Sequence, residues 1–108
     1  MRTSTRRHAL TKSQSQRIHA KRRFESRYGF HLNKFDYRDI VSACKSQSKK
    51  VMFIKSDSFR AHHYLIQIKG ALTQVVYDSD RKELITFLYP EQKDIKNFIN
   101  KIRKVTIN

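Results

Sequence analysis

Apolar residues recur at helical spacing in the first part of the chain. Ala20 and Phe24 share one stripe of a segment that Ser13 or Ser15 can cap and that ends just before Gly29. Glycine tolerates the left-handed conformation in which many helices end. We therefore predict an amphipathic helix over residues 13–28 whose remaining faces are polar and strongly basic.

The same spacing predicts two further helices. The first covers residues 37–45, with Asp36 as its predicted N-cap, and its apolar positions are Tyr37, Ile40, Val41 and Cys44. The second follows Pro90, and its apolar positions are Ile95, Phe98, Ile99 and Ile102. We expect the four residues of this closing helix to cover apolar sheet or helix surface.

Between these helices lie four short segments rich in β-branched and aromatic residues. They are residues 51–54, 64–68, 73–77 and 84–89. The connections are short and contain turn residues, among them Gly70 and Asp78, so the strands should form an antiparallel meander. The predicted fold class is α+β: two N-terminal helices packed on a four-stranded antiparallel meander, with a C-terminal helix.

The charge of the chain indicates the class of partner that it binds. The chain has 24 Lys and Arg against 9 Asp and Glu in 108 residues, a formal net charge of +15, and no carboxylate precedes Glu25. Such an excess attracts a polyanion, which favours nucleic acid as the partner, with RNA favoured over DNA. Residues 1–12 have too little apolar content to order themselves and are predicted to form a flexible basic arm, followed by one domain over residues 13–108. The predicted nucleic-acid-binding residues are Arg2, Arg6, Arg7, Lys12, Arg17, Lys21, Arg22 and Arg27.

Composition also excludes several classes of protein. No apolar run approaches the roughly 18–20 residues of a membrane span, which predicts a soluble, cytoplasmic protein without a membrane partner. Cys44 is the only cysteine, so an internal disulfide and a thiolate-rich zinc site are excluded. Two glycines cannot build a phosphate-cradling loop. We predict neither a cofactor nor a metal.

The first predicted helix carries the strongest candidate for chemistry. His19 and Arg23 lie along one border of the helix, together with Arg27. An imidazole exchanges protons near neutral pH, and a guanidinium stabilises the charge of a pentacovalent phosphorane. This combination suits RNA cleavage without metal by attack of the 2′-hydroxyl. The alternative is that His19 is one more polar residue on a solvated cationic helix.

The strand region adds weaker candidates. Arg60 precedes the second strand and is either a phosphate clamp or a solvated loop charge. The neighbouring His62 and His63 point to opposite faces of a strand, which argues against zinc. Thr86 is predicted to share a face with Leu84 and Leu88, where its hydroxyl either bonds a backbone carbonyl or lines a phosphate site.

The order of these parts resembles a known group. Four short motifs are similar to those of small endoribonuclease-like domains of the barnase, colicin and RelE superfamily. They are His19-Ala20-Lys21-Arg22-Arg23, Arg27-Tyr28-Gly29, Val76-Tyr77-Asp78 and the segment Ile-Thr-Phe-Leu-Tyr-Pro at residues 85–90. The resemblance spans residues 16–90. It implies a helix packed on a meandering sheet and a catalytic set drawn from His19, Arg23, Arg60, Thr86 and Tyr89. The arm and the closing helix have no counterpart in it.

Three interpretations follow from these patterns. The leading one is a metal-independent endoribonuclease of toxin or mobile-element type, with an antitoxin or immunity protein as a possible partner. The alternative is a non-catalytic module that binds RNA, DNA or a nucleoprotein, such as a phage-encoded inhibitor of a host nucleoprotein. The third is a ribosome-associated protein whose arm enters folded RNA.

Overall fold

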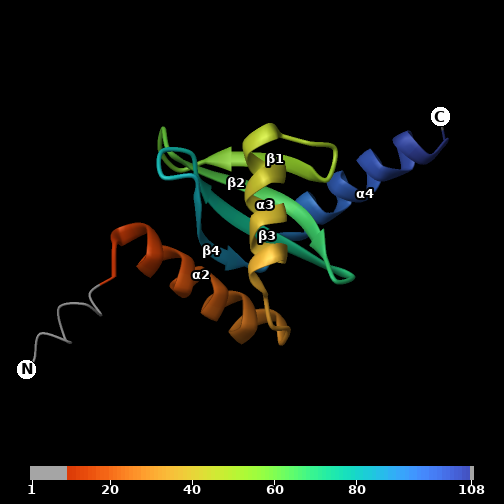
Figure 1. Ribbon diagram of the computed structural model, residues 1–108. Coiled ribbons are helices and arrows are strands. Elements are labelled where there is room, and N and C mark those ends of the chain that lie inside the picture. The colour runs from red at the N-terminus through yellow and green to blue at the C-terminus, as the bar shows by residue number, and fades with distance from the viewer. Residues whose placement is uncertain (1–9, 108) are drawn as a thin grey trace, which may run out of the picture.

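The computed structural model describes residues 10–107, and within that range it contains three helices and one sheet (Figure 1). In chain order the elements are α2 (Lys12–Tyr28), α3 (Lys34–Ser46), β1 (Val51–Ser56), β2 (Ala61–Ile68), β3 (Ala71–Asp78), β4 (Glu83–Leu88) and α4 (Gln92–Ile107). All neighbouring strands pair antiparallel in the order β1-β2-β3-β4. The predicted α+β meander is therefore confirmed.

α2 begins earlier than the sequence predicted. Its N-cap is Thr11, whose hydroxyl accepts a hydrogen bond from the Gln14 N–H at 3.0 Å, while the Gln14 side chain accepts one from the Thr11 N–H. This reciprocal capping box outcompetes Ser13 and Ser15 because it satisfies two otherwise unpaired backbone donors. Lys12, which was predicted to be in the flexible arm, thus belongs to the helix. Residues 1–9 of the predicted arm lie outside the described range. Gly29 ends α2 with φ 77°, as predicted.

α3 also starts before its predicted position. Asn33, rather than Asp36, is the N-cap, because its side-chain oxygen accepts a hydrogen bond from the Asp36 N–H at 2.8 Å. The first turn of α3 therefore includes Phe35, whose side chain is exposed. The C-cap is Gln47, a non-glycine residue with φ 50°.

One face of the sheet is covered by α2 and α3. A row of four apolar side chains crosses this face from β1 to β4, since Phe53 is in register with Tyr64, Tyr64 with Val75, and Val75 with Phe87. Phe24 of α2 packs edge-on against Phe87, with ring centroids 4.9 Å apart. In Figure 1, α3 crosses in front of the sheet while α2 lies beside β4. The main core lies between these helices and the sheet.

A bulge in β4 changes the face on which Thr86 lies. Leu84 is in register with Tyr77, but the next paired residue is Thr86 with Val76, so Ile85 is the additional residue. Tyr77 and Val76 are adjacent in β3 and point to opposite faces. Thr86 therefore shares a face with Leu88, which is in register with Gln74, but not with Leu84. The prediction from simple alternation was right for Leu88 and wrong for Leu84.

α4 packs less completely than predicted. Phe98 is buried and Ile95 is half-buried, but Ile99 and Ile102 are each 43% exposed. α4 contacts β2, and the Lys101 ammonium donates to the Val51 carbonyl at 2.6 Å. Because Phe98 is not part of the core beneath α2 and α3, it contributes to a separate, smaller buried region.

Candidate functional site

The exposed border of α2 brings together two of the predicted catalytic residues. His19 and Arg23 are one helical turn apart and both exposed, and the Arg23 Nε donates to the His19 Nε2 at 3.4 Å. With this hydrogen bond, Nε2 is the acceptor and Nδ1 carries the proton in the neutral ring. The imidazole and the guanidinium are thus adjacent on an open helix surface.

Arg60 lies near the N-terminal end of the same border. Its Nε is 3.8 Å from Asp78 Oδ2, and the same oxygen accepts a hydrogen bond from the Gln16 side chain at 3.3 Å. Gln16 precedes His19 by one helical turn, so Arg60 is tied to α2 through Asp78. Burial opposes ionisation of Asp78, but hydrogen bonds from the Arg81 N–H, Gln16 and the Asp80 N–H outweigh it and lower the pKa of this carboxyl. Arg60 is therefore partly neutralised by an ionised partner.

Tyr89 lies at the other end of the border, and Thr86 lies apart from it. The Tyr89 hydroxyl donates to the Arg27 carbonyl at 2.5 Å, and the Arg27 guanidinium lies 5.7 Å from the Tyr89 ring centroid. Thr86 is on the sheet face opposite to the one that α2 covers. The structure therefore pairs His19 with Arg23, connects Arg60 and Tyr89 to α2 separately, and does not draw the predicted set into one cavity.

A cationic groove between α2 and α3 is the feature that sequence reasoning missed. This α2–α3 groove encloses about 540 Å³ and is lined by six basic residues, namely Arg17, Lys21, Lys34, Arg38, Lys45 and Lys82. Arg17 and Lys21 were predicted to bind nucleic acid. The other four come from α3 and the β3–β4 turn, and no periodicity within the sequence reveals that these elements meet α2.

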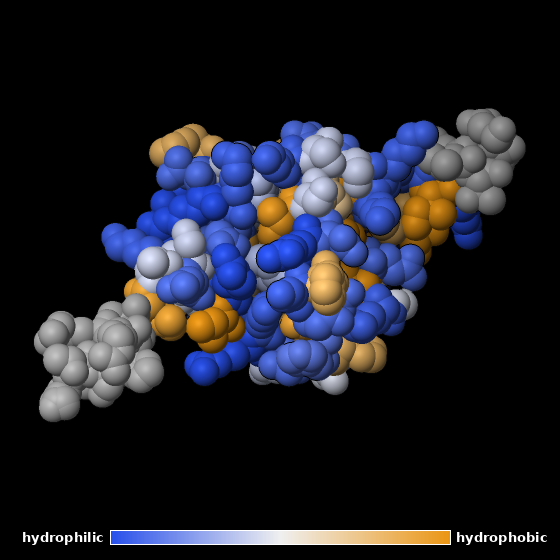
Figure 2. All heavy atoms as spheres, in the orientation of Figure 1, coloured by the Kyte–Doolittle hydropathy of each residue, from blue (hydrophilic) through white to orange (hydrophobic). Residues whose placement is uncertain are grey.

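The single carboxylate in the α2–α3 groove is already neutralised. Glu83 accepts from Arg17 at 2.7 Å through one oxygen and from the Tyr37 hydroxyl at 2.7 Å through the other. Among the described residues, no carboxylate lies within ion-pair distance of the other five cations. Hydrophilic side chains dominate the face of the molecule that α3 crosses (Figure 2). The groove thus carries a strong uncompensated positive charge.

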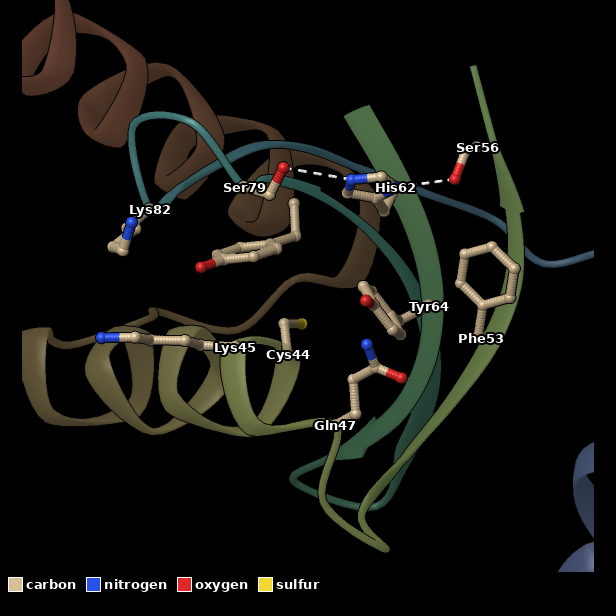
Figure 3. A pocket seen from close by; sticks show the side chains of 10 residues that line it. Cys44, Lys45, Gln47, Phe53, Ser56, His62, Tyr64, Ser79 and Lys82 are labelled. Atoms are coloured by element: carbon tan, nitrogen blue, oxygen red, sulfur yellow. Dashed lines mark hydrogen bonds between the residues drawn. The ribbon is translucent and has the colours of Figure 1, made fainter. Parts of the chain in front are cut away.

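A second cavity of about 490 Å³ adjoins the groove through Lys45 and Lys82, which line both. We call it the aromatic cavity because Phe53, Tyr64 and Tyr77 line it (Figure 3). Its remaining lining residues are Cys44, Gln47, Ser56, His62 and Ser79. Burial raises the pKa of the Cys44 thiol to about 12, so this cysteine is an unreactive part of the lining.

His62 is held at the rim of the aromatic cavity by two hydroxyls. Its Nδ1 is 2.6 Å from the Ser56 Oγ, and its Nε2 is 3.1 Å from the Ser79 Oγ (Figure 3). The neighbouring His63 points to the opposite face, is buried, and contacts Asp57 at 2.7 Å and Gln74 at 2.8 Å. Within residues 10–107, no three His, Cys, Asp or Glu side chains are grouped as metal ligands.

The remaining predicted binding residues lie around these features. Lys12 and Arg22 are exposed on α2, Arg27 is half-buried beside Tyr89, and Arg2, Arg6 and Arg7 lie outside the described residues. No helix in the described part of the chain is long and apolar enough to cross a membrane. Comparison with family models, curated proteins and solved structures finds no match to this chain.

Proposed function

We propose that the protein binds RNA through the α2–α3 groove and cleaves it at the His19 border of α2 without a metal ion. The observation that carries the binding proposal is the set of six cations in the α2–α3 groove around one neutralised carboxylate. A polyanion that enters such a groove releases its counterions, which supplies most of the binding free energy. α2 is only about 10–12 Å across, so a strand in the groove can also reach the opposite border of this helix.

The cleavage proposal rests on His19 and Arg23. In this reaction the RNA 2′-oxygen forms a bond to the adjacent phosphorus while the bond to the 5′-oxygen breaks. His19 takes the 2′-hydroxyl proton at Nε2 once the Arg23 Nε–H turns from this nitrogen to the phosphate. Water or a second acid protonates the leaving 5′-oxygen, and the products are a 2′,3′-cyclic phosphate and a 5′-hydroxyl. Arg23 faces the charge that develops on the phosphorane. The resemblance to endoribonuclease-like domains supports the same chemistry.

RNA binding without cleavage is the competing function. Arg60 is engaged by the Asp78 carboxylate, and the Tyr89 hydroxyl is engaged by a backbone carbonyl. Both groups would have to exchange partners before they could contact a phosphate. This observation favours a module that binds RNA and leaves it intact.

The binding proposal is tested by removing charge from the α2–α3 groove. The test variant replaces its five unpaired cations by Gln, at Lys21, Lys34, Arg38, Lys45 and Lys82. The control removes the same charge from exposed lysines elsewhere, at Lys49, Lys50, Lys55, Lys93 and Lys96. If all five contact phosphates of single-stranded RNA, the slope of log affinity against log salt should fall by about 3.5 in the test variant. Equal slopes in both variants would overturn the assignment of the groove.

Cleavage is tested with purified protein, RNA and EDTA, followed by analysis of the product ends. We expect cyclic phosphate ends with the wild-type protein and with His31→Ala, a control whose imidazole is exposed on the loop after α2. His19→Ala should abolish these products while RNA affinity stays unchanged. Binding by the wild-type protein without any product would establish the non-catalytic alternative.

A further inference from the structure

The aromatic cavity continues the α2–α3 groove into a site of different chemistry. Lys45 and Lys82 line both, and in Figure 3 they lie at one end of the cavity while Phe53 lies at the other. A chain of phosphates bound in the groove therefore leads to this opening. The inference that the cavity binds part of the same RNA strand rests on the proposed binding of RNA by the groove.

Aromatic rings form the wall of the cavity. Phe53 packs edge-on against Tyr64 with centroids 5.7 Å apart, and Tyr64 packs against Tyr77 at 6.5 Å. Tyr64 and Tyr77 are buried, whereas the Phe53 side chain is 51% exposed. Phe53 thus offers a ring to a ligand, and the two tyrosines hold that wall in place.

The rim of the cavity supplies hydrogen-bonding groups. His62, Ser56 and Ser79 form one connected set, in which the Ser79 hydroxyl also donates to the Arg60 carbonyl at 3.4 Å, and each hydroxyl oxygen still has a lone pair for a donor of a ligand. Burial raises the pKa of both Tyr64 and Tyr77, so their phenols stay protonated at neutral pH. A planar ligand with donors and acceptors along its edge fits these surroundings.

We propose that the aromatic cavity binds one unstacked nucleotide of a single-stranded RNA, with the base against Phe53 and its phosphate near Lys45 and Lys82. Bases of single-stranded RNA can leave the strand and stack on aromatic side chains, whereas paired bases in a duplex are covered on both faces. The volume of about 490 Å³ is in the range of small-molecule sites. The cavity therefore makes the protein prefer single strands over duplexes.

The test compares Phe53→Ala with Phe59→Ala, a matched control whose ring is 87% exposed and does not line the cavity. The probe is a 2′-O-methyl oligoribonucleotide, which cannot be cleaved by 2′-hydroxyl attack, as a single strand and as its duplex. Loss of one stacked base should weaken single-strand binding by about 5- to 150-fold. Duplex affinity and the salt slope should stay unchanged, and Phe53→Trp should retain single-strand affinity.

A second readout reports the base directly. A 2-aminopurine at the bound position of the single strand should change in fluorescence on binding to the wild-type protein and to Phe59→Ala, but not to Phe53→Ala. Equal single-strand affinity of the two alanine variants would overturn the proposal for the cavity alone. If the wild-type protein binds neither the strand nor the duplex, the proposed RNA binding fails as well.

Discussion

The hydroxyl of Tyr37 joins α3 to β4. Its removal tests how much this link between two elements that line the α2–α3 groove contributes to the stability of the fold. The Tyr37 side chain is 3% exposed. Its hydroxyl donates to Glu83 at 2.7 Å and accepts from the Leu84 N–H at 2.9 Å. Burial raises the pKa of Tyr37, so the phenol remains a donor at all pH values near neutrality. Tyr37→Phe removes this one oxygen and keeps the ring.

The cost follows from the two partners that the hydroxyl leaves behind. A buried donor or acceptor that loses its hydrogen bond costs about 1–3 kcal/mol, and Leu84 and Glu83 each lose one. Glu83 keeps its ion pair with Arg17, which limits its share. We therefore expect the free energy of unfolding to fall by about 2–4 kcal/mol. At about 4 °C or more per kcal/mol for a domain of this size, the Tm should fall by at least about 8 °C.

The measurement is thermal and urea unfolding followed by circular dichroism at neutral pH. Tyr28→Phe is the control, because the Tyr28 hydroxyl is half-buried and both of its partners are neutral backbone groups, the Leu88 carbonyl to which it donates and the backbone of Gln74. It should cost about 0.5–1.5 kcal/mol. A Tyr37→Phe variant as stable as the wild type, or no more affected than Tyr28→Phe, would refute the reasoning that this hydroxyl is the link between α3 and β4.

Two further predictions concern α4 and the Asp78 carboxyl. Phe98→Ala should lower the free energy of unfolding, measured in urea, by about 3 kcal/mol, because a buried ring is lost. Ile99→Ala, at a 43% exposed position, should lower it much less. Similar losses in the two variants would contradict the observed packing of α4. The pKa of Asp78 is lowered in the folded state, so its stabilisation is present above the unfolded pKa of about 3.9 and is lost as pH falls through the lower folded value. Asp78→Asn should therefore flatten the fall of Tm with pH in this acid range, and an unchanged profile would show that another carboxyl is responsible.

The amino-acid sequence alone was sufficient for the order and type of the elements. Helical spacing in α2 and α3, β-branched strands and the left-handed Gly29 are local features, and local features follow from neighbours along the chain. The helix starts were less accurate, because several polar residues compete for each cap. Thr11 and Asn33 are the N-caps because their side chains form hydrogen bonds with the first helical turn, and residue type alone does not predict which candidate forms them.

Tertiary structure decided which residues share a site. His19 and Arg23 were predictable as neighbours because one helical turn separates them, but the bulge at Ile85 moved Thr86 to the other face. The α2–α3 groove and the aromatic cavity combine side chains from helices, strands and a turn that lie far apart in sequence. Periodicity describes only one element at a time, whereas the charge of a groove depends on how separate elements pack against each other.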